Sequence, residues 1–262
     1  MRVLPRPWSA PTEFKPEELL ASVREMRRLP EAAAPEVCLL EFDGDLTDWM
    51  AATGRSRACP GWACFHTRLD VFDAGGFDAG IVARTIGGPY AVLVAEQLLA
   101  SGARVILGLT SAGRIEPGLR LPAIVVARAA LRDEGTSHHY LPPGDVVETR
   151  ETLVRALHEA LRDAAADTRI GAVWTTDAPY RETIEQIEGY RAQGVLAVEM
   201  QAASLYAFAQ ARGAACAVVA HVSNAVDHDK EGQFDRGGEA AGFDIALRMA
   251  RAGRNWLREA GA

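Results

Sequence analysis

Apolar and polar positions along this chain form two alternating kinds of segment. Short apolar runs predict buried strands, whereas longer segments with apolar residues three or four positions apart predict helices with one buried face. The predicted strands are residues 37–40, 81–83, 105–107, 123–127, 172–174, 194–198 and 216–220. The predicted helices are residues 16–29, 91–99, 150–165, 181–193 and 237–260, with two more that contain Trp49 and follow Glu199.

The alternation of these strands with helices predicts a mostly parallel sheet that is covered on both faces. Residues 1–35 are expected to form an N-terminal arm and a helix. Residues 36–262 are expected to form a single α/β domain, because no stretch within them has the composition of a linker. Residues 53–76, which combine glycines and a proline with aromatic residues, predict irregular or hairpin structure.

Composition narrows the kind of partner. The formal charge is −7 and no cluster of lysine and arginine occurs, which argues against nucleic-acid polymers and anionic membranes. The chain has no apolar run of about 18 residues and opens without the apolar segment of a signal peptide, so a cytoplasmic location is expected. The four cysteines form no CxxC pair and predict reduced core thiols. A small molecule is therefore the expected partner.

The stretch 194–206 is the most informative part of the chain. It reads as a short apolar strand that ends at Glu199 and turns at once, through Met200, into an alanine-rich helix. The carboxyl ends of parallel strands are where α/β proteins hold small ligands. In the alternative interpretation, Glu199 stabilises the first turn of the helix and Met200 fills the core.

A second polar segment follows the predicted strand 105–107. Residues 108–114 are small and polar, and they predict a loop whose backbone N–H groups and hydroxyls can cradle an oxyanion. An ordinary tight turn is the alternative.

A third polar segment follows the predicted strand 172–174. Asp177, Tyr180 and Arg181 lie beside Trp174, and such groups can stack on a planar heterocycle and hydrogen-bond its edges. A helix cap provided by Asp177 or Thr176 is compatible with the same residues.

Two further polar loops occur. Residues 221–229 follow the last predicted strand, and no metal site is expected there because adjacent loop positions rarely converge on one ion. Residues 132–140 are expected at a rim or a subunit contact. The GxSxG, P-loop and GxGxxG motifs do not occur, so readings as a serine hydrolase or as an enzyme of nucleoside triphosphates or dinucleotides lose their usual support.

Taken in order, these segments resemble the motif series of the nucleoside phosphorylase superfamily, with its uridine phosphorylase-like branch as the nearest match. The resemblance spans roughly residues 36–250. The motifs that carry it are Gly87-Gly88-Pro89, Thr110-Ser111-Ala112-Gly113, Asp133-Glu134-Gly135-Thr136-Ser137, Thr175-Thr176-Asp177-Ala178, Val198-Glu199-Met200 and Ser223-Asn224. It implies a three-layer α/β/α sandwich around a twisted, partly barrel-like mixed sheet, in a homo-oligomer that is a dimer or a hexamer.

The reaction that the resemblance implies is cleavage of the N-glycosidic bond of a nucleoside by a pentosyltransferase. Inorganic phosphate would be the co-substrate, and no other cofactor is expected. Positive charge develops on the sugar and negative charge on the departing base, so the enzyme must stabilise both in the transition state.

The resemblance also implies roles for individual residues. Asn224, which would hydrogen-bond the leaving base, and Asp227 are the expected catalytic residues. The expected substrate-binding residues are Ser111, Ala112, Gly113, Trp174, Tyr180, Arg181, Glu199, Met200 and Gln201, with Met200 against the sugar. The expected site for phosphate or water comprises Gly44, Asp45, Arg84, Thr110 and Ser111.

Three positions depart from the family pattern. Uridine phosphorylases have a Gly-Asp-Pro-x-Arg loop where this chain has residues 44–48, which end in Asp48, and a second phosphate-binding arginine is replaced by Gly108. Each lost guanidinium removes charge-assisted hydrogen bonds worth roughly 1.5–3 kcal/mol. Gln201 replaces a glutamate that binds the ribose hydroxyls, which predicts an altered or more weakly held sugar.

Three functions remain open on the sequence, and phosphorolysis is preferred among them. The first is a nucleoside phosphorylase in which Arg84, Arg114, or Arg55 or Arg57 of a partner subunit replaces the missing arginines; the frequency of phosphorylases in the family favours it. The second is a nucleosidase in which Glu41, Asp43 or Asp45 orients water, as the acidic loop favours. The third is a nucleoside-binding protein without catalysis.

Overall fold

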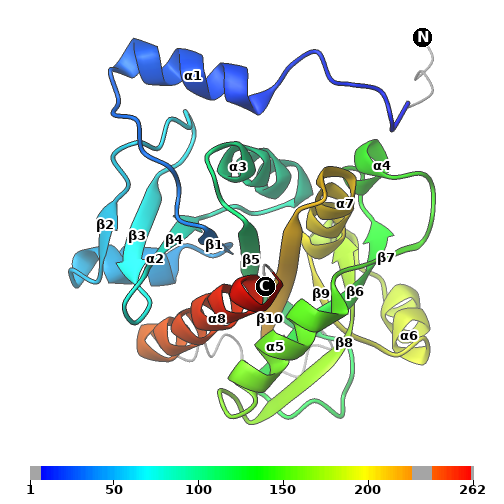
Figure 1. Cartoon of the computed structure of the whole chain (residues 1–262). Helices are drawn as coiled ribbons and strands as arrows, with labels where there is room; N and C mark the ends of the chain where they lie inside the picture. Colours follow the sequence, from blue (N-terminus) through cyan, green and yellow to red (C-terminus); the bar gives the residue numbers. More distant parts are fainter. Residues whose placement is uncertain (1–6, 226–237, 261–262) are drawn as a thin grey trace.

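The computed structural model describes residues 7–225 and 238–260 and forms a mixed α/β structure around one sheet (Figure 1). The strands are β1 (Val37–Glu41), β2 (Ser56–Ala58), β3 (Leu69–Asp73), β4 (Asp78–Ala83), β5 (Val105–Arg114), β6 (Ala123–Asp133), β7 (Val146–Glu148), β8 (Asp167–Thr176), β9 (Val195–Glu199) and β10 (Ala215–Ala225). The helices are α1 (Pro16–Arg27), α2 (Asp45–Ala52), α3 (Gly88–Ala100), α4 (Ser137–Tyr140), α5 (Glu151–Leu161), the short 3-10 helix η1 (Pro179–Arg181), α6 (Ile184–Ala192), α7 (Ala202–Arg212) and α8 (Glu239–Ala260).

Five of the strands close into a barrel. β5 pairs with β10, β10 with β6, β6 with β8, β8 with β9, and β9 returns to β5. The remaining path runs from β5 through β1, β4 and β3 to β2, which forms an open wing beside the barrel. The expected twisted, partly barrel-like mixed sheet is therefore confirmed.

The sheet is less parallel than the alternation of strands and helices indicated. In the centre of the sheet, β1 is parallel to both β4 and β5, and β5 is parallel to β10. In contrast, β6 is antiparallel to β10, and β9 is antiparallel to β5. Residues 53–76 form part of an antiparallel hairpin, in which β3 pairs with β4 and also with β2. The direction in which two strands pair depends on the route of the chain between them, which the run of apolar residues does not reveal.

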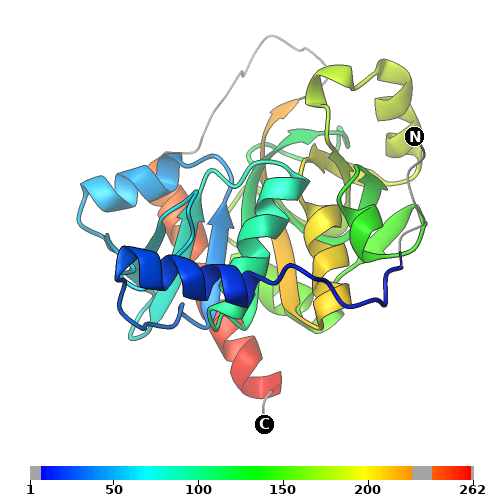
Figure 2. The ribbon, with the colours of Figure 1, turned by 90° about the horizontal axis from the view of Figure 1, so that it is seen from above.

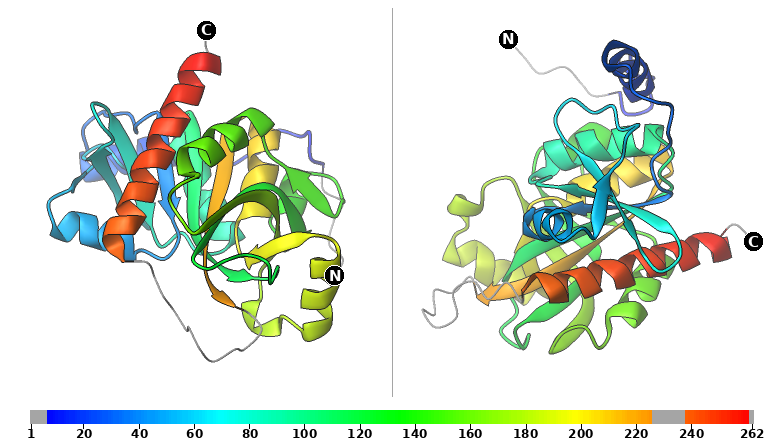
Figure 3. Two further views of the ribbon diagram at one scale, coloured as in Figure 1. Left: turned by 90° about the horizontal axis from the view of Figure 1, so that it is seen from below. Right: turned by 90° about the vertical axis from the view of Figure 1, so that its left-hand side faces the viewer.

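Helices cover both faces of the sheet, as the three-layer prediction requires. α3 and α7 lie over one face (Figure 2). Their apolar side chains join a core that includes Leu98 and Phe208. α2, α5 and α8 lie over the other face (Figure 3). Met50, Leu157 and Met249 on these helices belong to a second core. In the described ranges, none of the helices is long and apolar enough to cross a membrane.

The N-terminal segment is attached to the first of these layers. α1 begins with Pro16, which is tolerated in the first turn because the N–H it lacks would have no partner inside the helix. Its buried residues Leu20 and Val23 pack with Ala63, and α1 contacts α3. Farther out, the indole N–H of Trp8 donates to the carbonyl of His138 over 3.1 Å.

β5 is longer than predicted. Residues 108–114 continue the strand instead of forming a loop, and they pair with residues 218–225 of β10, with a register shift between Val222 and Asn224. Pairing with β10 engages the backbone along one edge of this segment, so the segment is a strand and not the expected loop. The small residues serve packing: a side chain at Gly108 would meet Val218 and Phe42 at 3.0 and 3.1 Å.

Tyr206 fastens α7 to the barrel. Its buried hydroxyl donates to the carbonyl of Ala127 on β6 over 2.5 Å and accepts from the N–H of Val218 on β10 over 3.0 Å. One side chain thus satisfies backbone groups on two barrel strands.

Candidate active site

A cavity of about 370 Å³ lies where β1, β5 and β10 end and α2 and α8 begin. This volume is in the range of sites for small ligands. Its described lining combines apolar and polar side chains from all these elements. The lining residues are Glu41, Asp43, Asp45, Leu46, Ile86, Leu109, Thr110, Ser111, His221, Ser223, Gly238, Glu239, Ala241, Gly242 and Ile245.

Glu41 organises the loop at the end of β1. Its buried carboxylate accepts from the N–H of Gly44 over 2.6 Å, and from the hydroxyl of Thr47 over 2.9 Å and its N–H over 3.3 Å. Burial raises the pKa of Glu41 above its usual value, and these hydrogen bonds offset only part of that rise. Because its oxygens bind the loop and the start of α2, Glu41 holds the neighbouring acidic residues at the cavity.

Gly44 is required in this loop for two reasons. Its φ of 97° lies in the region that residues with a side chain rarely adopt, and a Cβ would approach the Arg84 side chain to 2.6 Å. Gly44 therefore shapes the loop, and the next residue, Asp45, lines the cavity as the first residue of α2.

Ser111, Asp43 and His221 form the polar centre of the cavity. The hydroxyl of Ser111 donates to Oδ1 of Asp43 over 2.8 Å. His221 on β10 is the register partner of Ser111 on β5, and both line the cavity. Thr110 lines it too, but its hydroxyl donates to the carbonyl of Ser111 over 2.7 Å.

The charged side chains of the described cavity lining are acidic. Among the lining residues that the structure describes, Glu41, Asp43, Asp45 and Glu239 carry carboxylates and none is lysine or arginine. Such a lining attracts positive charge and repels an anion. This is the reverse of the charge that the expected phosphate site would need.

Arg84, which was expected to bind phosphate, is turned to another partner. Its guanidinium pairs with Asp48, and Nη1 donates to Oδ1 of Asp48 over 3.2 Å. This hydrogen bond lowers the pKa of Asp48 and raises that of Arg84. The carboxylate at the position of the family arginine thus binds a nearby arginine outside the described cavity lining.

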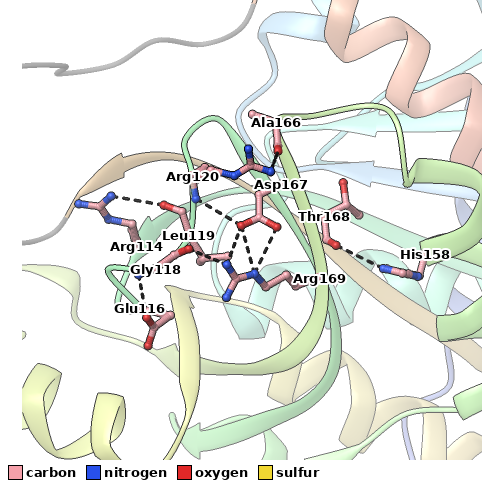
Figure 4. Close-up of polar contacts among 10 residues, drawn as sticks. All are labelled: Arg114, Glu116, Gly118, Leu119, Arg120, His158, Ala166, Asp167, Thr168 and Arg169. Atoms are coloured by element: carbon pink, nitrogen blue, oxygen red, sulfur yellow. Dashed lines mark hydrogen bonds and ion pairs between the residues drawn. The ribbon is translucent and has the colours of Figure 1, made fainter.

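The other three candidate arginines also contact their own chain. Arg114 donates to the carbonyl of Leu119 over 3.4 Å, beside a cluster in which Arg169 binds the Asp167 carboxylate (Figure 4). The Arg55 guanidinium lies 4.5 Å from the centre of the Trp49 ring. Arg57 forms an ion pair with Asp78 over 2.6 Å.

The segments expected to build the site are neighbours in the sheet. Gly113 of β5 is paired with Asn224 of β10 on one side and with Val198 of β9 on the other. Val198 is in turn paired with Trp174 of β8. The topology therefore brings 108–114, 174–176, 198–201 and 223–224 together, although they are far apart in the sequence.

The side chains of the 199–201 segment lie mostly inside the protein. The Glu199 carboxylate accepts from the N–H groups of Gln201 and Ala202 over 2.6 and 2.8 Å and from the hydroxyl of Thr175 over 2.5 Å. Glu199 is only 4% exposed, and burial raises its pKa to about 7. It thus stabilises the first turn of α7, which was the alternative interpretation of this residue.

Gln201 and Met200 occupy the turn before α7. Gln201 is 2% exposed and its Oε1 accepts from the N–H of Met200 over 3.0 Å. Met200 is half-buried. Both lie outside the described lining of the cavity, as do Glu199, Ala112 and Gly113.

The residues on β8 and η1 that were expected to bind the base do not line a common pocket. Trp174 is 1% exposed, donates to Asp133 over 3.0 Å and packs 4.7 Å from the ring of Tyr190, so it belongs to the core and not to a pocket wall. Tyr180 is fully exposed and Arg181 is exposed beside it. Because Trp174 and Val198 pair in the sheet and share a small core under α6, the tryptophan faces away from solvent.

Of the two expected catalytic residues, the structure describes the backbone of Asn224 but not Asp227. The backbone of Asn224 is part of β10, where it pairs with Gly113. Asp227 lies outside the described residues.

Several lining residues were missed on the sequence. Glu239, at the first position of α8, and His221, inside β10, reach the cavity from segments more than one hundred residues from Asp43. His221 belongs to the polar segment 221–229, which directly follows the apolar run 216–220. A polar residue at the end of an apolar strand could have indicated a place in the site. For Glu239 nothing in the local pattern indicated a role, because acidic residues are common in the first turn of a helix.

The 132–140 segment is partly buried. Glu134 accepts from the Ser204 hydroxyl over 2.6 Å and from the N–H of Ser137, while Arg132 donates to the Ser137 hydroxyl over 2.9 Å. These four residues are buried. Their polar groups satisfy one another, so the cluster joins this segment to α7 inside the protein.

The acidic cavity lies at the ends of parallel strands, which is where α/β proteins commonly hold small molecules. The sequence profile of the phosphorylase superfamily matches residues 67–252, which is more than half of the chain. The chain therefore belongs to the phosphorylase superfamily.

Individual relatives agree with this assignment. A uridine phosphorylase from Thermococcus kodakarensis is 28% identical over 202 residues, which cover 70% of each chain. A guanosine phosphorylase from Halorubrum lacusprofundi is 28% identical over 138 residues, and the match spans 57% of its length. The solved structure of a purine nucleoside phosphorylase from Toxoplasma gondii in complex with immucillin-H has the same fold, with a TM-score of 0.74 at 20% identity over 88% of this chain and 95% of that one.

Proposed function

We propose that this protein cleaves the N-glycosidic bond of a nucleoside in the acidic cavity and that water is the nucleophile. The observation that carries the proposal is the hydrogen bond from Ser111 to Asp43. Asp43 would accept the proton of the attacking water, and Ser111 would hold the carboxylate in place.

The electrostatics of the cavity support water over phosphate. Ser111 is the residue that the family resemblance places beside the attacking anion, and its hydroxyl already donates to a carboxylate of the protein. A phosphate ion placed there would lie among Glu41, Asp45 and Glu239, with like charges close by. Water carries no net charge and can donate a hydrogen bond to Asp43.

The same carboxylates would also favour the transition state. As the glycosidic bond breaks, the sugar acquires positive charge, which negative side chains fixed around it stabilise without further rearrangement. The apolar lining residues Leu46, Ile86 and Ile245 supply the surface against which the uncharged parts of a nucleoside can pack.

Phosphorolysis is the second candidate, because the relatives named above are nucleoside phosphorylases. Such an enzyme would use inorganic phosphate as co-substrate and a uridine-type or purine nucleoside as substrate. The missing positive charge would come from a partner subunit in a homo-oligomer, either a dimer or a hexamer.

Release of the base from a panel of nucleosides, with and without phosphate, tests the proposal. Uridine, 2′-deoxyuridine, inosine and guanosine are each incubated with the purified protein, and the free base and the sugar product are separated by chromatography. Hydrolysis gives the free sugar at a rate that phosphate does not raise. Release that requires phosphate and yields a sugar phosphate would instead establish phosphorolysis. No release from any nucleoside under either condition would favour a binding protein.

A further inference from the structure

An ion pair between Asp48 on α2 and Arg84 after β4 lies beside the cavity. Both terminal nitrogens of the Arg84 guanidinium donate to this carboxylate, Nη1 to Oδ1 and Nη2 to Oδ2. The side chains of Asp48 and Arg84 are 58% and 56% exposed, and an ion pair this open to solvent contributes little to stability. Its main effect is electrostatic, because it fixes where the positive charge of Arg84 lies.

The side chain of Arg84 crosses the loop that carries two carboxylates of the cavity. A Cβ at Gly44 would lie 2.6 Å from Cγ of Arg84 and 3.0 Å from its Nε and Cζ. The residues on either side of Gly44 are Asp43 and Asp45, and both line the cavity. Ile86, two positions after Arg84, lines it as well. The guanidinium is therefore held directly next to the lining of the site.

The backbone of Arg84 is anchored to the end of β1. Its N–H donates to the carbonyl of Glu41 over 2.8 Å. Its φ of 58° lies in the left-handed region, which residues with a side chain rarely adopt. Because the backbone is held in place, the charge can move only by rotation of the side chain. The partner that the guanidinium binds therefore decides where the charge lies.

Asp48 draws this charge away from the cavity. Neither Asp48 nor Arg84 belongs to the described cavity lining. Besides the hydrogen bond to Asp48, the charges of Glu41 and Asp45 raise the pKa of Arg84, and both of these residues line the cavity. Without the Asp48 carboxylate, the attraction that remains comes from these two groups. The guanidinium would then turn toward them and bring positive charge to the site.

A guanidinium at the cavity would change which nucleophile can enter. Inorganic phosphate is an anion at neutral pH, and arginine binds its oxygens through two parallel N–H···O hydrogen bonds. In the structure both Nη atoms of Arg84 donate to Asp48, so this pair of donors is already occupied. Water is uncharged and needs no such partner.

We infer that Asp48 is a specificity-determining residue that holds the guanidinium of Arg84 and thereby keeps phosphate out of the cavity, which leaves the position of the nucleophile to water. This inference rests on the proposed function. Asp48 contacts no reacting atom and acts through Arg84. The chemical class that it excludes is the inorganic oxyanion.

A phosphate titration of the full chain, followed by phosphorus NMR, tests this role. Asp48→Ala should bind inorganic phosphate at least about tenfold more tightly than the wild type, which corresponds to one added charge-assisted hydrogen bond. In the double variant Asp48→Ala/Arg84→Ala the gain should disappear, because the released guanidinium is its source. Equal affinities of the wild type and Asp48→Ala, or a gain that persists without Arg84, would overturn the inference.

Formation of the free sugar gives a second readout. In Asp48→Ala, added phosphate should lower the rate at which free sugar forms, because phosphate competes with water for the same place. The wild type should not respond. Asp78→Ala is the matched control, since it breaks another exposed ion pair, in which the side chains of Asp78 and Arg57 are 53% and 63% exposed. A response of Asp78→Ala equal to that of Asp48→Ala would contradict a specific role of Asp48.

The two readouts separate this inference from the proposed function. If the wild type releases no base, the proposed function fails, while the phosphate titration still decides whether Asp48 withholds Arg84. If the wild type hydrolyses nucleosides and Asp48→Ala gains no affinity for phosphate, only the role of Asp48 fails. Base release that requires phosphate in the wild type would overturn both.

Discussion

The hydroxyl of Ser111 donates a hydrogen bond to Oδ1 of Asp43 over 2.8 Å, and this contact joins the strand β5 to the acidic loop that follows β1. The two residues are 68 positions apart in the chain. Their contact places a negative charge of the protein at the position where the family resemblance expects an external anion.

Asp43→Asn should abolish most of the hydrolysis. An amide keeps the size of the side chain and one acceptor oxygen, but it cannot take the proton of water at neutral pH. We expect kcat for base release to fall by about 10²–10⁴-fold with little change in folding stability. Asp163→Asn, an exposed aspartate after α5, serves as the control and should retain full activity. If Asp43→Asn hydrolyses nucleosides at the wild-type rate, Asp43 is not the base.

Gly108→Ala should destabilise the barrel. The added methyl group would lie 3.0 Å from Val218 and 3.1 Å from Phe42, which is tighter than most carbon contacts in proteins, so these side chains would have to move. We expect a loss of about 1–3 kcal/mol in the free energy of unfolding, measured by urea denaturation. Gly189→Ala on α6 meets no atom within 4 Å and should be neutral or slightly stabilising.

The same crowding has a functional meaning. Phe42 and Val218 occupy the space beside position 108, so an arginine at this position, as in the family pattern, would have to displace them. A stability of Gly108→Ala equal to that of the wild type would show that the site can adjust and would weaken this explanation.

Glu199 should make stability depend on pH. In the unfolded chain this carboxyl titrates near 4.5, whereas burial in the folded protein raises its pKa to about 7. Between these values the folded state holds a proton that the unfolded state has released, so stability falls as the pH rises through this window, by about 3 kcal/mol in all.

The variant Glu199→Gln cannot ionise, and urea denaturation at about pH 4.5 and about pH 8 should show a smaller loss of stability across the window than in the wild type. The buried Glu134 also acts on Glu199 and is left unchanged in this comparison. Glu188→Gln on the exposed side of α6 is the matched control and should keep the wild-type pH dependence. An unchanged dependence in Glu199→Gln would mean that another group is responsible.

Tyr206→Phe should loosen the contact between α7 and the barrel. Removing the hydroxyl leaves the N–H of Val218 and the carbonyl of Ala127 without this partner in a buried place. The expected cost is about 1–3 kcal/mol of unfolding free energy, measured by thermal or urea denaturation. Tyr180→Phe removes the same hydroxyl from a fully exposed side chain and should have no measurable effect. Equal stabilities of the two variants would contradict the role given to Tyr206.

Much of the fold could be predicted from the sequence, because the spacing of apolar residues along the chain indicates which faces of strands and helices are buried. The apolar runs located all of the described strands except β2, β3 and β7, and Pro16 and Glu199 marked helix starts that the structure confirms. The pattern failed where strands continue through polar or small residues. Residues 108–114 extend β5 because pairing with β10 satisfies their backbone, which is a property of a distant segment.

The sequence by itself determined the layered α/β architecture, the acidic loop after β1 and the family to which the chain belongs, since each depends on residues that are close together in the chain. Only the tertiary structure decided that Asp43, Ser111, His221 and Glu239 share one cavity while Trp174 and Glu199 lie inside the protein. The physical reason is that strand closure and helix packing fix which face of each strand meets which neighbour. These pairings join residues far apart in the sequence, and no local pattern records them.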